Sequence, residues 1–238
     1  MDFYIGYIVS GVIILIAIII SLVMQVKVNS AFDKYKDVPS SLDMTGAELA
    51  QKLADKAGIC VAVRSCAGKL TDHYNPKDRS LNISEANFNS RSIASHAVVA
   101  HEFGHALQDA NSYAPLKVRQ VVVKISNIVS GLLMPLLLIG ILLQLFWIAG
   151  AGNIIIYVSV GIYAVSVIAG LVTLPVEFNA SSRAKKILVE MGSTSDEEVK
   201  GTDRVLNAAA MTYVASLFVS LAYFLRFLFL LLAMRDNW

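Results

Sequence analysis

His101, Glu102 and His105 form the H-E-x-x-H spacing, which can bind and use a metal ion when it lies on a helix. Residues four apart lie on one helical face, so both imidazoles can reach one Zn²⁺. Glu102 then lies beside the open coordination position, where its carboxylate can accept a proton from a metal-activated water. The pattern predicts a catalytic zinc site with Glu102 as general base.

The segment around the motif has the composition of a buried helix running from Ser90 or Ser92 to about Ala110. Its small and apolar residues are Ile93, Ala94, Ala97, Val98, Val99, Ala100, Phe103, Ala106 and Leu107. Ionisable side chains on such a helix are costly unless they are paired or bind a metal. A chance match to the motif is the alternative to a metal site.

A catalytic zinc site needs a third protein ligand. Positions 108 and 111 hold Gln and Asn, so the longer H-E-x-x-H-x-x-G-x-x-H pattern is absent. Glu177 is the candidate, because it follows an apolar stretch, where an ionisable group is costly unless it has a function. An ordinary glutamate at the membrane interface is the alternative.

The composition is that of a membrane protein, with 56% hydrophobic and only 16% charged residues. Four apolar stretches are long enough to cross a bilayer: Phe3–Val26, Ile125–Asn153, Ile154–Val176 and Val205–Met234. Because the first is long and Asp2 precedes it, we expect an anchor and not a cleaved signal peptide. The chain is thus expected to be an α+β membrane protein with about four transmembrane helices.

Basic residues concentrate in two polar segments, with 13 Lys and Arg between the first two spans and 5 between the last two. The positive-inside rule places both segments in the cytoplasm of a multi-pass protein of the plasma membrane. The expected organisation is a transmembrane helix over 3–26, a cytoplasmic zincin-like domain over 37–121, transmembrane helices 2 and 3 over 122–176, a cytoplasmic segment with the third ligand over 177–204, and transmembrane helix 4 over 205–234. Both polar segments can then contribute to one site.

The first polar segment is predicted to combine a helix with a small sheet. The apolar residues of Ser41–Ala57 have helical spacing. Within this segment, Thr45 is the candidate N-cap and Glu48 completes a capping box, while Gly58 ends the helix. Strand-like patterns follow at 59–63, 70–74 and 80–83, and the turn residues at 75–78 predict a hairpin between the last two. Together with the motif helix, this indicates a short antiparallel sheet beside an H-E-x-x-H helix.

Tyr213 is a candidate catalytic donor to the oxyanion, because it begins the fourth span on the same side as Glu177. A tyrosine of the aromatic belt is the alternative. His73 could also serve, or it could be a surface histidine on the hairpin, whose edge offers a place for an extended peptide. His96 lies about 140° around the helix from His101 and should not share the metal.

Three sequence blocks carry a resemblance to a known family: Leu70–Pro76, Ser92–Gln108 and Pro175–Ser181. With the N-terminal anchor, they make the chain resemble the predicted neutral zinc metallopeptidases of bacterial membranes of the YugP type. The layout is also similar to HtpX and the CAAX prenyl proteases, which are gluzincins. The resemblance implies that Glu177 is the third zinc ligand and that the site lies at the inner membrane face.

One position departs from the HtpX-like pattern. Ser181 stands four residues after Glu177, where that pattern has an aspartate, so the carboxylate that orients a ligating histidine is missing or replaced. Asn179 or Ser181 are the two candidates for this role.

Three functions fit these observations. The first is a membrane-embedded endopeptidase that acts on peptides or membrane proteins. The second is a zinc hydrolase of non-peptide substrates, and the third is a non-catalytic membrane interaction protein with a structural zinc. The intact Glu102 speaks against the third, because a structural site needs no base.

Partners follow only in part from the sequence. Membrane lipids are expected partners, whereas the net charge of +2 gives no reason to expect nucleic acid. Cys60 and Cys66 are expected to be free thiols in the cytoplasm. The substrate and the oligomeric state stay open.

Overall fold

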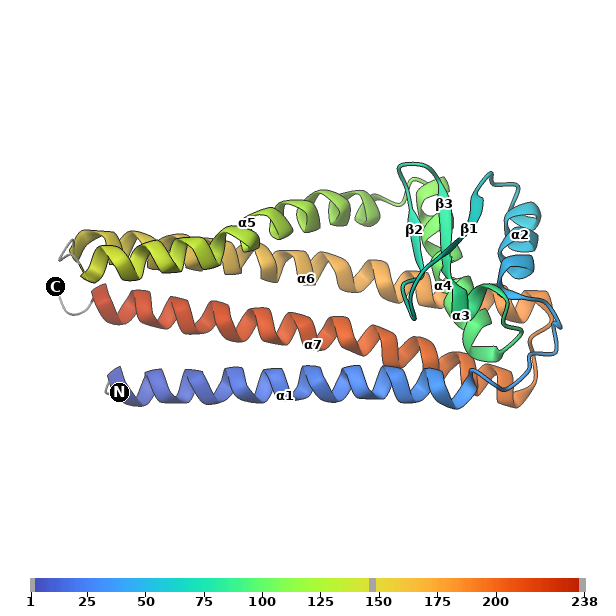
Figure 1. Ribbon diagram of the computed structural model, residues 1–238, viewed down its shortest axis with the longest axis horizontal. Helices are drawn as coiled ribbons and strands as arrows, with labels where there is room; N and C mark the ends of the chain where they lie inside the picture. Colours follow the sequence, from blue (N-terminus) through green and yellow to red (C-terminus); the bar gives the residue numbers. More distant parts are fainter. Residues whose placement is uncertain (1–2, 146–148, 236–238) are drawn as a thin grey trace. The chain divides into compact units, whose positions relative to one another are not determined.

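The computed structural model describes residues 3–145 and 149–235, which form two compact units (Figure 1). The helical unit comprises the described residues of Met1–Val23, Val118–Leu174 and Tyr213–Trp238. The mixed unit comprises Met24–Lys117 and Pro175–Thr212. The three candidate metal ligands therefore belong to one unit, although they are far apart in the sequence.

The helical unit is built from parts of four long helices: α1 (Phe3–Tyr35), α5 (Ala114–Leu145), α6 (Ala149–Met191) and α7 (Asp196–Arg235). Within it, α1 and α7 pack side by side through Ile14, Ala17 and Ala222. In the part of the chain that the structure describes, three helices are long and apolar enough to cross a membrane, namely Ile5–Tyr35, Tyr157–Met191 and Asp196–Leu232. The expected second span, Ile125–Asn153, includes residues 146–148, which lie outside the described residues, so a fourth span stays a prediction.

The mixed unit contains the C-terminal ends of α1 and α6 and the N-terminal end of α7. It adds six shorter elements: α2 (Gly46–Ala57), β1 (Ala62–Cys66), β2 (His73–Asn75), β3 (Ser80–Ser84), α3 (Glu85–Phe88) and α4 (Ile93–Ala110). The predicted capping box of α2 is confirmed, since Thr45 Oγ1 accepts from the Glu48 N–H and Glu48 accepts from the Thr45 N–H. Gly58 ends this helix with φ +65°, a conformation that favours glycine.

The sheet has the order β1-β3-β2, with β3 in the centre. The predicted hairpin is confirmed, because β2 and β3 pair antiparallel with Tyr74 opposite Leu81. The expectation of a wholly antiparallel sheet is wrong: β1 pairs parallel to β3, with Ala62 opposite Ser80. β1 and β2 are consecutive in the sequence, but they form the two edges of the sheet and β3 lies between them. The alternation of side chains along a strand does not predict this strand order.

The core of the mixed unit surrounds α4. Leu49 and Leu53 of α2, and Leu81 and Ile83 of β3, pack in one buried cluster with Phe103 of α4. The same cluster includes residues of three long helices: Phe32, Tyr35, Ala184, Leu188, Val205 and Leu206. Packing on all sides explains why α4 is rich in small and apolar residues. It also holds α4 rigidly, as a helix carrying metal ligands must be held.

The turn between α6 and α7 is tied to the loop after α1 by one buried carboxylate. Glu198 accepts hydrogen bonds from the hydroxyls of Ser40 and Ser41 at 2.9 and 2.8 Å, and from Ser195 Oγ at 2.9 Å. The backbone N–H groups of Ser41 and Ser195 also donate to it. Although burial opposes the charged form, these donors lower the pKa of Glu198 to about 2.

We expect Glu198→Gln to destabilise the protein at pH 7 by about 2 to 3 kcal/mol, since hydrogen bonds to a charged acceptor are lost. Because the native pKa is lowered, this stabilisation is complete above the ordinary value of 4.5 and disappears as the pH falls toward 2. Unfolding of the detergent-solubilised protein between pH 7 and pH 3 should therefore show the gap between wild type and variant closing. The exposed neighbour variant Glu197→Gln should show no gap, and a pH-independent gap would contradict the assignment.

Candidate metal centre

His101 and His105 project from one face of α4, as their spacing predicts. Their ring centroids are 4.9 Å apart and the ring planes meet at 86°, so the two rings do not stack face to face. Ser92 caps the helix by accepting from the Ser95 N–H, which fixes where α4 begins relative to the motif. His105 is 7% exposed, and it lies deep in the mixed unit.

Glu177 of α6 faces both rings. Its Oε2 lies 3.2 Å from His101 Nε2 and 3.7 Å from His105 Nε2, and the carboxylate is only 1% exposed. Two ligands of one tetrahedral Zn²⁺, each at about 2.0 to 2.1 Å, are separated by about 3.4 Å, which agrees with these distances. Two imidazoles and one buried carboxylate are also the donor types of a catalytic zinc site, so the residues fit the metal.

The electrostatics of the three groups favour a cation between them. Burial alone lowers the pKa of His105, but contact with Glu177 and the nearby charge of Glu102 raise it overall. A buried carboxylate is costly to ionise without a positive partner. A proton or a metal ion can supply that positive charge.

Hydrogen bonds fix the tautomer of His105. Its Nδ1 lies 2.9 Å from Gln108 Oε1, while Gln108 Nε2 donates to the Val176 carbonyl at 2.9 Å and to Asn179 Oδ1 at 3.0 Å. Because both of these partners are acceptors, the Gln108 amide has one orientation, and its Oε1 must accept from the His105 Nδ1–H. Nε2 of His105 is thereby left as the ring nitrogen that can bind a metal ion.

Ser181 supports the other histidine. Its Oγ lies 3.2 Å from His101 Nδ1, again on the side of the ring away from Glu177. Of the two candidates for the role of the missing aspartate, Ser181 contacts a candidate ligand, His101. Asn179 instead accepts from Gln108 and from Arg183 Nε, the latter at 2.8 Å. Gln108 itself was missed as a supporting residue, although its position three residues after His105 on one helical face was a signal.

Gly104 allows α4 and α6 to approach closely enough for three ligands to meet. A Cβ at this position would lie 2.7 Å from the backbone oxygen of Ala180, closer than real Cβ contacts. That oxygen belongs to the helix that carries Glu177, so it cannot give way without moving the ligand. Close packing of α4 against α6 therefore explains why the motif has a glycine at position 104.

Glu102 lies outside the ligand group and is held against the sheet edge. Its Oε2 accepts from the backbone N–H of Tyr74, in β2, at 3.0 Å. Burial raises the pKa of Glu102, while the imidazoles of His101 and His105 act in the opposite direction. Tyr74 is itself anchored to α4, because its hydroxyl donates to Asp109 Oδ2 at 2.9 Å. Tyr74 thus joins the edge strand to the motif helix at Glu102 and again at Asp109.

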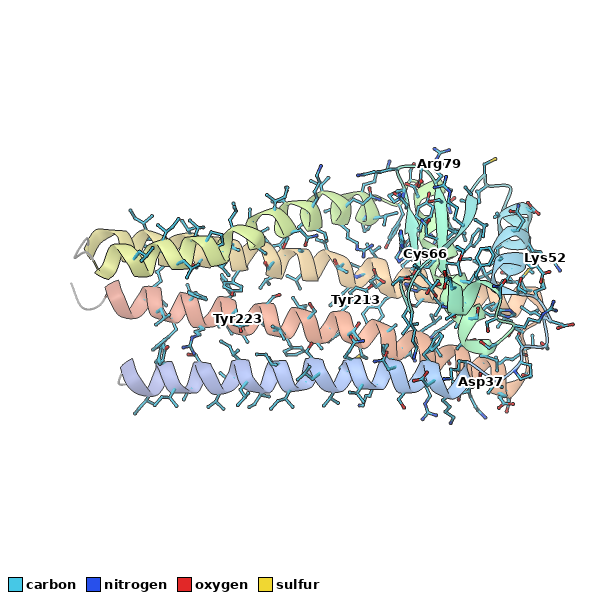
Figure 2. All side chains as sticks on the ribbon, in the orientation of Figure 1. Asp37, Lys52, Cys66, Arg79, Tyr213 and Tyr223 are labelled. Carbon is cyan, nitrogen blue, oxygen red and sulfur yellow. The ribbon has the colours of Figure 1, made fainter. Side chains whose placement is uncertain are left out.

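The other sequence candidates lie elsewhere. His96 is buried, and its Nε2 lies 2.7 Å from the Met44 carbonyl, so it does not share the metal group, as expected. His73 is exposed on β2, and its Nδ1 contacts the Thr71 carbonyl. Tyr213 is half-buried on α7, within the helical unit (Figure 2), and its catalytic role stays a prediction. Cys66, also labelled there, is a free thiol, as expected.

Comparison with known proteins agrees with this geometry. Residues 10–232 match the family described as "Putative neutral zinc metallopeptidase". The chain belongs to this family. It is also similar to the "Putative membrane protease YugP" of Bacillus subtilis (strain 168), with 43% identity over 214 residues, which cover 90% of the chain and 92% of the relative. No solved structure matches the chain.

These matches confirm the family resemblance and the expected cofactor, zinc. Zinc is the metal of the family, and His101, His105 and Glu177 form a group that can hold a metal ion. A membrane location is supported by the relative and by the three apolar helices.

We expect Gln108→Met to weaken zinc binding about 10- to 100-fold, since the side chain that fixes the His105 tautomer is lost. A titration against a fluorescent zinc chelator measures this affinity. Gln51→Met, on the exposed face of α2, is the matched control and should bind zinc like wild type. Unchanged affinity in Gln108→Met would show that this hydrogen bond does not support the metal site.

Proposed function

We propose that the protein is a membrane-embedded metalloendopeptidase of the gluzincin type. The observation that carries the proposal is the convergence of His101 and His105 from α4 with Glu177 from α6 around one point. Three protein ligands leave a fourth position open for water, as catalytic zinc sites require and structural sites usually do not. When bound, zinc lowers the pKa of that water toward about 7 and polarises the substrate carbonyl.

Glu102 is proposed as the general base. Its carboxylate orients the attacking water, takes its proton, and passes that proton to the nitrogen of the leaving amine. Burial raises the pKa of Glu102, which makes the carboxylate a better proton acceptor than it would be in water. The Tyr74 N–H leaves the other carboxylate oxygen available for this work.

The edge strand β2 supports a peptide substrate over other carbonyl compounds. β2 pairs with β3 on one side only, and its Tyr74 N–H points away from β3 toward Glu102. An extended peptide that adds to this edge would run past the proposed base, with its backbone held by main-chain hydrogen bonds. We propose peptides or membrane proteins as the substrates, with the site on the cytoplasmic side of the plasma membrane. Tyr213 stays the proposed donor to the oxyanion.

The test uses full-length protein purified in detergent and incubated with casein before zinc chelation, after chelation, and after zinc is restored. Mass spectrometry of the products identifies new peptide termini, and circular dichroism follows the fold. We expect cleavage that stops on chelation and returns with zinc, while helix content is kept. Zinc loss that unfolds the protein, with no cleavage in any sample, would indicate a structural site. Cleavage of ester substrates without peptide products would indicate another hydrolase.

A further inference from the structure

A basic cavity lies in the mixed unit, between α1 and α7. Its volume is about 390 Å³, and it is lined by Lys27, Ser30, Ala31, Lys34, Arg204 and Ala208. Cavities of this size hold small ligands or headgroups. The two alanines keep the space open, because a larger side chain at either position would fill it. None of these residues belongs to the candidate metal centre.

Within residues 3–145 and 149–235, no acidic side chain pairs with the three cations of the cavity. In the described ranges, Lys27, Lys34 and Arg204 make no salt bridge, although Lys34 Nζ lies 5.4 Å from the centre of the Tyr35 ring. The adjacent acids are paired with other bases instead. Asp33 contacts Lys36 and Lys69 at 3.3 and 3.0 Å, and Asp203 contacts Lys185 at 2.7 Å. The cavity therefore keeps an uncompensated positive charge, which favours an anionic ligand.

Two of the cations mark the ends of apolar helix segments. Lys27 is the first charged residue after the apolar stretch Phe3–Val26 of α1. Arg204 is the last charged residue before the uncharged run 205–225 of α7. Lys and Arg at such positions lie at the level of the lipid headgroups. An anion bound here is thus at the depth where phospholipid phosphates lie, with apolar helix surface beside it for acyl chains.

We propose that this cavity binds the phosphate group of an anionic phospholipid. The three cations pair with the phosphate, and the hydroxyl of Ser30 can donate to one of its oxygens. A lipid with a net negative headgroup is favoured over a zwitterionic one, because a choline cation would be repelled by the same three side chains. Free phosphate has the same anionic chemistry but lacks the acyl chains.

The test is native mass spectrometry of the full-length protein in detergent, titrated with short-chain phosphatidylglycerol, short-chain phosphatidylcholine or inorganic phosphate. We expect phosphatidylglycerol to bind at least about tenfold more tightly than phosphatidylcholine. The triple variant Lys27→Gln, Lys34→Gln and Arg204→Gln should weaken phosphatidylglycerol binding on the order of a hundredfold, at about fivefold for each charge. Ala208→Phe fills the cavity without changing its charge. Because the phosphate can then no longer enter, this variant should bind phosphatidylglycerol no more tightly than phosphatidylcholine.

The control removes three lysines from elsewhere in the mixed unit: Lys52, on α2 (Figure 2), Lys77 and Lys186, each replaced by Gln. It should keep the preference for phosphatidylglycerol, and thermal unfolding checks that all variants are folded. Equal binding of the two lipids, or an equal loss in the control, would overturn the proposal. Inorganic phosphate bound as tightly as phosphatidylglycerol would overturn the lipid as the ligand. No readout depends on peptidase activity, so the result is independent of the proposed function.

Discussion

Glu177→Gln is expected to yield purified protein that has lost its zinc. The carboxylate is 1% exposed and faces both histidines, so we expect it to supply one of three ligands and the only negative charge among them. An amide is a far weaker zinc ligand and carries no charge. We expect the affinity to fall by more than about 100-fold, which is beyond the effect of a supporting residue. Zinc content by atomic emission, with titration against a chelator, measures it.

Glu190→Gln is the matched control for this variant, because Glu190 lies exposed on the same helix. It should hold about one zinc per chain, like wild type. Thermal unfolding of both variants separates loss of the metal from loss of the fold. Full zinc retention in a folded Glu177→Gln protein would mean that the third ligand is another group.

Glu102→Gln is expected to keep zinc and to lose at least about a thousandfold in the rate of casein cleavage. Glutamine has nearly the same shape, and its carbonyl oxygen can still accept from the Tyr74 N–H, so the local structure should persist. The amide cannot take a proton from water, and the ligands His101, His105 and Glu177 are untouched. Retention of zinc combined with loss of cleavage assigns Glu102 to the chemical step.

The control is Glu85→Gln at the exposed start of α3, which should leave cleavage unchanged. Cleavage at the wild-type rate in Glu102→Gln would reject this residue as the base. Loss of zinc together with activity would instead make Glu102 a support of the metal site.

Local sequence signals predicted the parts of the site that depend on neighbouring residues. The capping box of Thr45 and Glu48 and the one-face spacing of His101 and His105 both act within a few residues. The prediction of Glu177 rested on a different principle, the cost of an ionisable group beside an apolar span. Both kinds of reasoning identified residues that the structure brings together.

Features that depend on contacts distant in the sequence were not predictable in the same way. The parallel pairing of β1 with β3 depends on which strand fills the central place, and alternation does not report this. His105 and Gln108 are only three residues apart, but the direction of their hydrogen bond depends on Val176 and Asn179 of α6, which orient the Gln108 amide. The close approach at Gly104 likewise becomes visible only when Ala180 lies beside it.

The division of the ligands between α4 and α6 has a consequence for the timing of activity during synthesis. His101 leaves the ribosome 76 residues before Glu177, and an apolar stretch of α6 lies between them. A nascent chain that carries the motif helix alone has two ligands and cannot complete the zinc site. The zinc site therefore cannot be completed until α6 has been synthesised, so an unfinished copy would lack the peptidase activity that we propose for this protein.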